Sequence, residues 1–416
     1  MTNLGKGGLS SSKIHGISSG LSARPRRRAS DTLALVKPKA AGPYVFEGSI
    51  DALVQELQPT IPLYVMRPDI LVQQAQAFVR GFHGTAMYAV KVNPDKHVLQ
   101  TLFKAGIKSF DVASIEEVRL IRKVAPKATM HFMHPIKSRE AIAEAYFMHG
   151  VRSFVLDCRD ELYKILQETR YAGDLTLMIR LAVKEDSSVF SLAGKFGATV
   201  AEAADLLRLG RSVSAKLGVT FHVGSQCMDP KAYRRALQLC ADAVKLSGVS
   251  VDVVDAGGGF PSVYPGMNPP PLADYFAEIH QAVADLGFGG CELLCEPGRA
   301  LVAAAGSLIT RVELRKGDMI YLNDGTYGGM FDASNAFKFP FATRRAGGTG
   351  AAQGDMAYRF SGPTCDTVDM MDGPFHLPAD MVEGQWVQID GMGAYSLSVR
   401  GNFNGFGRSA TVFLKE

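Results

Sequence analysis

The sequence has no apolar run long enough to cross a bilayer, and no membrane partner is expected. It also has no C-x-x-C spacing of the kind that holds zinc, so no metal site is predicted. Scattered, unmatched cysteines are typical of a reducing compartment, and the chain is expected to be cytoplasmic. The six cysteines are Cys158, Cys227, Cys240, Cys291, Cys295 and Cys365.

The net charge is also small, since 45 basic and 41 acidic residues give a formal net charge of only +4. Much of the excess lies in "RPRRR" (Arg24–Arg28), within a stretch rich in Ser and Gly. A nucleic-acid surface would need basic residues that recur along the folded part, and they do not, so no nucleic-acid partner is expected. Residues 1–40 are predicted to form a disordered basic tail, although their Arg-rich, acid-poor composition also fits a transit peptide.

What the sequence does have is a repeat. A length of 416 residues with 47% hydrophobic content suggests one large and one smaller domain. From Ile61 onward, short β-rich runs alternate with longer segments of helical periodicity. Eight such runs are "AMYAVKV", "IKSFDVA", "TMHFMHP", "SFVLD", "LTLMIRLA", "VTFHVGS", "VDVVDAGG" and "ELLCEPG".

Eight strand-helix units favour a closed parallel (β/α)8 TIM-type barrel, predicted over residues 63–305, rather than an open doubly wound sheet. After residue 306 the helical period disappears. Short alternating runs such as "MIYLND" and "WVQID" then predict an antiparallel β-sandwich or β-barrel domain over residues 306–416. Residues 41–62 are expected to join that β domain through the strand-like "GPYVFEG".

Unusual residues fall at the ends of the predicted barrel strands, where a (β/α)8 barrel carries out its chemistry. Each has an ordinary explanation: a lysine at a strand end is usually a solvated cap, a single histidine usually a hydrogen-bonded core residue, and a glycine run often a tight turn. Their convergence on one mouth is what calls for a chemical interpretation. They are Lys91, Asp111, His134, Arg180, His222, Gly257 to Gly259, Glu296 and Arg299.

The glycine run "DAGGGFP" is neither a Walker loop nor a dinucleotide fingerprint, but consecutive glycines leave backbone N–H groups free to bind a phosphate. A lysine desolvated at a barrel mouth is expected to have a lowered pKa and to form a Schiff base. An acid such as Glu296 holds a pyridine nitrogen protonated, and a flat imidazole such as His222 stacks on its ring. Together these groups predict pyridoxal 5'-phosphate (PLP) as cofactor.

The same residues lie in motifs that resemble one family: the PLP-dependent basic amino acid decarboxylases with an alanine-racemase-like barrel, among them ornithine and diaminopimelate decarboxylases. The resemblance runs from about Tyr64 to Phe413, and its motifs occur in the family's order. They are "YAVKVN", "FDVAS", "FHVGSQ", "DAGGGFP", "EPGR", "SGPTCDTVD" and "GAYSLSVRGNFNGF".

The resemblance implies Lys91 as the covalent anchor of the cofactor, with Asp111 and Glu117 near it. It implies a catalytic set of Lys91, Cys365, Glu296 and His222. The remaining residues expected to bind the cofactor are Asp111, Arg180, Ser225, Gly257, Gly258, Gly259, Gly298, Arg299 and Tyr395.

On the substrate side, the resemblance implies that Cys365 donates a proton, that Asp366 binds the distal amine and that Phe403 lines the pocket. The segment "SGPTCDTVD" is similar to one that the family sends into the neighbouring subunit's active site, so a homodimer with shared active sites is expected. Asp332 is taken as the second substrate-binding acid, in a stretch where the pattern departs from the family.

Asp366 also bears on the substrate, because diaminopimelate decarboxylases usually carry Cys-Glu-Ser where this chain has Cys365, Asp366 and Thr367. An anion there suits the distal ammonium of ornithine or lysine. The favoured assignment is conversion of L-ornithine to putrescine and CO2 in polyamine biosynthesis, with lysine to cadaverine as a second activity. The alternatives are a diaminopimelate decarboxylase, a non-catalytic regulatory homologue, a cofactor-free aldolase and a racemase.

Overall fold

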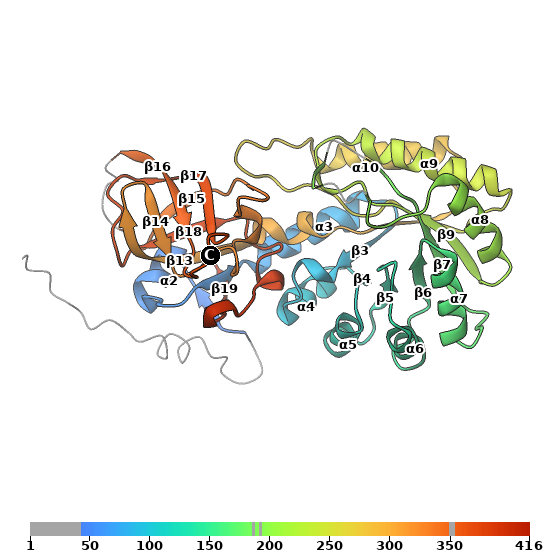
Figure 1. Ribbon diagram of the computed structural model, residues 1–416, viewed down its shortest axis with the longest axis horizontal. Coiled ribbons are helices and arrows are strands. Elements are labelled where there is room, and N and C mark those ends of the chain that lie inside the picture. The colour runs from blue at the N-terminus through green and yellow to red at the C-terminus, as the bar shows by residue number, and fades with distance from the viewer. Residues whose placement is uncertain (1–42, 185–187, 191–193, 349–353) are drawn as a thin grey trace, which may run out of the picture.

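The computed structural model describes residues 43–184, 188–190, 194–348 and 354–416, and the expected tail at 1–40 lies outside them. The chain forms a barrel domain and a β-rich domain that lie end to end (Figure 1). Among the described residues, no helix combines the length and apolarity needed to cross a membrane.

Eight parallel strands form the barrel, and β12 pairs with β3 to close it. This closed barrel confirms the predicted fold class, and all eight expected runs contribute a strand. The strands are β3 (Thr85–Ala89), β4 (Ser109–Val112), β5 (Thr129–Phe132), β6 (Ser153–Leu156), β7 (Thr176–Arg180), β9 (Lys216–Thr220), β11 (Val253–Asp255) and β12 (Glu292–Cys295).

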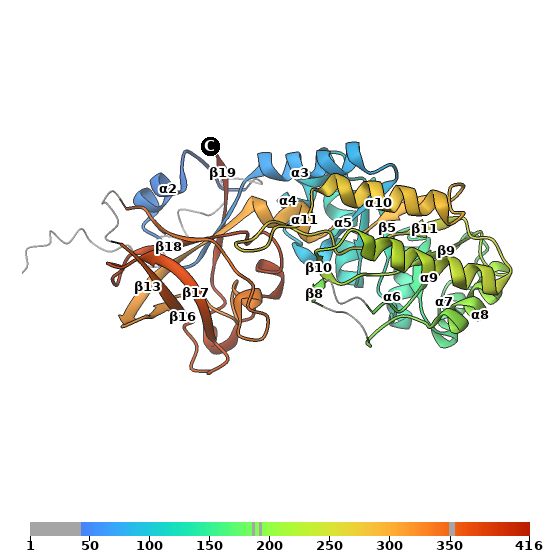
Figure 2. The same ribbon diagram turned by 90° about the horizontal axis from the view of Figure 1, so that it is seen from above.

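Helices cover the outside of the barrel (Figure 2). Local sequence fixes where several begin: the Ser114 side chain caps α5, and Thr199 forms a capping box with Glu202 at α8. The helices are α3 (Pro68–Gly81), α4 (Lys96–Lys104), α5 (Ile115–Val124), α6 (Arg139–Phe147), α7 (Arg159–Glu168), α8 (Val200–Arg211), α9 (Lys231–Ser247), α10 (Leu272–Asp285) and the short α11 (Arg299–Val302) with η2 (Ala303–Ala305).

A small apolar cluster contributed by the barrel strands separates the two ends of the barrel. Its six side chains are almost fully buried, which leaves the barrel a packed core and confines polar residues to its ends. The cluster consists of Met87, Met133, Val155, Met178, Val253 and Leu294. At the rim, β8 (Ser188–Phe190) pairs with β10 (Ser225–Cys227).

The second domain is built on a nine-stranded sheet with the helix α2 (Ile50–Leu57). Most neighbouring strands are antiparallel, as predicted, but the pairs β1·β19, β19·β2 and β14·β16 are parallel. The strands are β1 (Val45–Glu47), β2 (Leu63–Met66), β13 (Gly306–Lys316), β14 (Met319–Leu322), β15 (Thr343–Ala346), β16 (Asp355–Ser361), β17 (Met370–Pro378), β18 (Trp386–Asp390) and β19 (Ala410–Lys415). The short helices are η3 (Phe331–Ala333), η4 (Leu397–Val399) and η5 (Phe403–Gly405).

The predicted start of the barrel at residue 63 is wrong, because strand β2 belongs to the β domain. It pairs with β13 and β19 in the sheet of the β domain, although residues 63–66 were assigned to the barrel. The chain enters the barrel only at Pro68, the first residue of α3. Because all four β2 residues are buried, their apolar pattern did not reveal which sheet they join.

Candidate active site

A cavity of about 770 Å³ lies at the carboxyl ends of the barrel strands, and loops of the β domain supply part of its wall. Most of the residues predicted to bind a cofactor meet there. Those that line it are Lys91, Arg180, His222, Ser225, Gly259, Glu296, Gly298, Arg299 and Tyr395, together with Asp332.

Lys91 does not lie in a strand, because β3 ends at Ala89 and Lys91 belongs to the one-turn helix η1 (Val90–Val92). Its Nζ lies 3.3 Å from Oδ2 of Asp111. The lysine side chain is 44% exposed towards the cavity, whereas Asp111 is 2% exposed. The Asp111 carboxylate raises the pKa of Lys91 and outweighs burial, so the predicted lowering of this pKa is wrong for the chain without cofactor.

Three hydrogen bonds join the turn that carries Lys91 to the β domain, one of them from the Ser398 hydroxyl to the Val92 carbonyl at 3.1 Å. The Tyr395 N–H donates to the Val92 carbonyl at 3.0 Å, and Asn93 Nδ2 donates to the Gly393 carbonyl at 2.9 Å. Tyr395 has a left-handed backbone with φ of 49°. The phenol and the amine are therefore placed in one cavity wall by the same contacts.

Glu117 lies in the first turn of α5, near Asp111. Its Oε2 accepts a hydrogen bond from the Ala113 N–H at 2.7 Å. Burial raises the pKa of Glu117 to about 7, and the nearby Asp111 adds to this.

Glu296 follows β12 and forms a buried acid pair with Asp255, the last residue of β11. Burial first, and then the charge of Asp255, raises the pKa of Glu296 well above its usual range, and burial also raises the pKa of Asp255. Asp255 also accepts hydrogen bonds from Thr220 Oγ1 and the Gly257 N–H, both at 2.9 Å. A protonated ring nitrogen is the kind of group that such a pair can hold.

The glycine run packs tightly against the end of β9. Gly257 has φ of 66°, and a Cβ there would lie 1.9 Å from the Phe221 carbonyl oxygen. A Cβ on Gly258 would lie 2.8 Å from Nε2 of His222. Burial and the charge of Arg180 lower the pKa of His222, whose Nδ1 accepts from the Gly224 N–H at 3.0 Å. His222 is therefore a neutral, oriented ring.

Arg299 is the strongest candidate for the phosphate end. Its Nη1 lies 2.9 Å from Oδ2 of Asp332 and donates to the Tyr264 hydroxyl at 3.1 Å. Its Nε is buried and has no hydrogen-bond partner among the described residues. A free guanidinium donor next to a glycine loop fits a phosphate group, so the residues present fit PLP.

Of the predicted substrate-side residues of the β domain, Asp332 lines this chain's cavity, whereas Cys365, Asp366 and Phe403 do not. Cys365 is exposed and donates through its Sγ to Asn404 Oδ1 at 3.4 Å. Asp366 accepts from the Tyr327 hydroxyl at 2.7 Å, and the Tyr327 ring lies 4.8 Å from that of Phe403. These residues form a surface of their own, which we call the donor face (Cys365, Asp366 and Phe403).

Sequence reasoning missed two members of the site, Asp255 and Tyr264. Asp255 had a detectable signal, since it stands at a predicted strand end directly before the glycine run. Tyr264 had none, because only the folded chain brings its hydroxyl to Arg299.

Comparison with known proteins agrees with this geometry. The model of the pyridoxal-dependent decarboxylases, pyridoxal binding domain, matches residues 69–303. The chain belongs to the pyridoxal-dependent decarboxylase family. Its cofactor is PLP, as the predicted barrel, lysine and glycine loop implied.

Two relatives of this chain carry different names. Ornithine decarboxylase of Schizosaccharomyces pombe is 32% identical over 79% of this chain and 77% of its own. Antizyme inhibitor 2 of Xenopus laevis is 31% identical over 77% of this chain and 74% of its own. Among solved structures, lysine/ornithine decarboxylase from Vibrio vulnificus, complexed with cadaverine, superposes with a TM-score of 0.74 at 30% identity, covering 88% of this chain and 95% of that one.

Proposed function

We propose that this chain decarboxylates a basic L-amino acid, with L-ornithine, giving putrescine and CO2, as the main substrate and lysine as a second one. The observation that carries the proposal is the pairing of an exposed thiol with a neighbouring carboxylate, Cys365 and Asp366, on one face. An aspartate there suits a distal ammonium, and the relatives that act on ornithine and lysine support the same class.

Within the barrel, Lys91 would anchor the cofactor and Arg299 would hold its phosphate. The bound cofactor supplies an electron sink for the pair released when the carboxylate leaves as CO2. Glu296, which is hydrogen-bonded to Asp255, would supply a proton to the ring nitrogen and, as the resulting carboxylate, accept a hydrogen bond from it. The neutral ring of His222 would lie against the cofactor without adding a competing charge.

The donor face would complete the site of a second copy in a homodimer. It lies outside its own cavity, and its exposure leaves it open to a partner. Cys365 would donate the proton that replaces CO2 at Cα, while Asp366 would bind the distal ammonium and Phe403 would pack on the aliphatic chain. Asp332, which is paired with Arg299, would be the second acid near the substrate.

A decarboxylation assay tests the proposal by comparing kcat/KM for ornithine, lysine, arginine and meso-diaminopimelate. We expect ornithine to be highest, with lysine within about 10- to 200-fold, because one methylene is worth only about 1–3 kcal/mol in such a pocket. A preference for diaminopimelate would contradict the role of Asp366. Absence of any turnover would favour a regulatory homologue, but Lys91 and Cys365 are both retained, and they are the residues such a homologue is expected to lose.

A further inference from the structure

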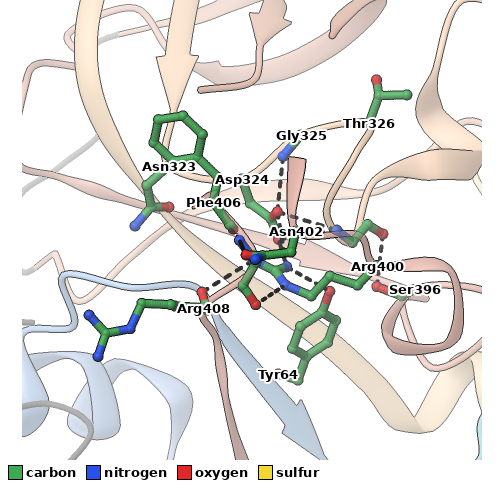
Figure 3. Close-up of polar contacts among 12 residues, drawn as sticks. Tyr64, Asn323, Asp324, Gly325, Thr326, Ser396, Arg400, Asn402, Phe406 and Arg408 are labelled. Carbon is green, nitrogen blue, oxygen red and sulfur yellow. Dashed lines mark hydrogen bonds and ion pairs between the residues drawn. The ribbon is translucent and has the colours of Figure 1, made fainter. Parts of the chain in front are cut away.

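A buried ion pair, Arg400–Asp324, joins three segments of the β domain, the third being that of Tyr64 (Figure 3). The side chains of Arg400 and Asp324 are 6% and 1% exposed. Nη1 of Arg400 lies 3.0 and 2.9 Å from the two carboxylate oxygens of Asp324, and it also donates to the Tyr64 hydroxyl on β2 at 3.2 Å. None of these groups lines the cavity.

The other donors of Arg400 hold the segment that follows the donor-face residue Phe403. Nε donates to the Gly407 carbonyl at 3.1 Å. Nη2 donates to the carbonyls of Phe406 and Arg408 at 3.1 and 3.2 Å. Only the planar fork of an arginine reaches a carboxylate and three carbonyls together. One guanidinium thus fixes the path of residues 401–408 relative to Asp324.

The segment after Asp324 is wrapped around its carboxylate. Asp324 accepts from the N–H groups of Gly325 at 3.0 Å and Gly329 at 3.3 Å. A Cβ on Gly328 would lie 1.5 Å from Oδ1 of Asp324, so a larger residue does not fit there. This segment carries Tyr327, which contacts both Asp366 and Phe403.

A second buried acid ties the Cys365 turn to the same segment. Asp369 is 1% exposed and accepts from the Thr326 N–H at 2.7 Å and the Thr364 N–H at 3.0 Å. The segments that carry the donor face are therefore held by two buried carboxylates, Asp324 and Asp369, and Arg400 is the cation that links Asp324 to the Phe403 segment.

We propose that Arg400 is a positioning residue that sets the geometry of the donor face for catalysis in the partner subunit's active site. This inference rests on the proposed function, because it assumes that Cys365, Asp366 and Phe403 act across a dimer. Tyr395, which lies in the same loop and lines this chain's own cavity, provides the competing possibility that Arg400 acts within its own subunit.

The variant Arg400→Lys separates positioning from folding. Lysine keeps a cation against Asp324 but loses the donors to Gly407, Phe406 and Arg408. We expect kcat/KM to fall about tenfold or more, since small misplacements of reacting groups are costly, while the melting temperature stays near that of the wild type. Arg359→Lys is the matched control, because Arg359 also pairs with an aspartate, Asp318, but on the surface.

Coexpressed subunit pairs show on which side Arg400 acts. Lys91→Ala with Cys365→Ala should regain roughly a quarter of native activity, from the one intact site of each mixed dimer. Coexpression of Arg400→Lys with Lys91→Ala should give a higher activity per subunit than Arg400→Lys alone. In this mixed dimer, Lys91 of the Arg400→Lys subunit faces the intact donor face of the Lys91→Ala subunit. Coexpression of Arg400→Lys with Cys365→Ala should give a lower activity per subunit than Arg400→Lys alone.

If activity recovers instead in the pair of Arg400→Lys with Cys365→Ala, the inference is overturned, and Arg400 acts on the cavity of its own subunit. A fall in melting temperature that matches the loss of activity, with no gain in either pair, would overturn it in favour of a merely structural role. Failure of the Lys91→Ala and Cys365→Ala pair to regain activity would contradict the shared site itself, and this outcome is distinguishable because it does not involve Arg400.

Discussion

The barrel mouth and the donor face differ in how their polar groups are satisfied. At the mouth, two of the charged groups face a partner within the same chain, in the pairs Lys91–Asp111 and Arg299–Asp332. The donor face leaves Cys365 exposed and Phe403 43% exposed, although buried groups hold both from behind. The difference indicates that the barrel mouth is preorganised within one chain, whereas the donor face is left exposed, as the proposed shared site requires.

The largest effect should come from Lys91→Ala at the mouth. We expect loss of the yellow absorbance of the bound cofactor and a fall in activity of at least about 10³-fold, because the covalent anchor is removed. Absorbance spectra and a decarboxylation assay measure both. Lys96→Ala, an exposed lysine five residues further along, is the control. Retained absorbance in Lys91→Ala would contradict the anchor.

Glu296→Gln should lower kcat about 10²-fold with little change in KM, since an amide cannot share a proton with Asp255 and the ring nitrogen. Steady-state kinetics measure the effects on kcat and KM separately. Glu292→Gln, on the exposed end of the same strand, should leave kcat unchanged. An unchanged kcat in Glu296→Gln would show that the buried pair does not serve the reaction.

Asp366→Asn tests the other half of the comparison. We expect kcat/KM for ornithine to fall about 10- to 100-fold, which corresponds to loss of one hydrogen bond to a charged group. The cofactor absorbance should stay as in the wild type, because Asp366 lies outside the cavity. Asp372→Asn, an exposed acid on β17, is the control. A changed cofactor spectrum in Asp366→Asn would contradict the assignment of cofactor binding to the barrel mouth alone.

The smallest effect should be a pH dependence of stability from Glu117. Its folded pKa of about 7 lies above its ordinary value, so the folded chain loses stability as pH rises from about 4.5 through 7. Glu117→Gln keeps an acceptor for the Ala113 N–H but does not ionise. The stability of Glu117→Gln relative to the wild type should therefore increase between pH 5 and 8, by no more than about 3 kcal/mol in the free energy of unfolding. Melting temperatures measured across this pH range report the change. A pH-independent difference would contradict the raised pKa.

The sequence predicted the barrel because alternating periods of strand and helix survive in the chain order. It did not predict the partner strands of β2, because a fully buried strand looks the same in either sheet. The sign of the Lys91 pKa shift was also missed. It depends on the 3.3 Å distance to Asp111, which no spacing encodes. The motifs identified Cys365 and Asp366, whereas Arg400 became visible only from its buried contacts.

The pairing of β19 between β1 and β2 has a consequence for synthesis. A chain that leaves the ribosome from its amino end makes β1 and β2 before the barrel, and their common neighbour β19 only afterwards. Strand β2 can pair with β13 as soon as the barrel has been made, whereas β1 waits for β19 until nearly the whole chain has been translated, and the barrel can fold as a unit in the meantime. Deleting residues 410–415 should accordingly leave a folded barrel and a β-sheet from which the edge strand β1 is detached.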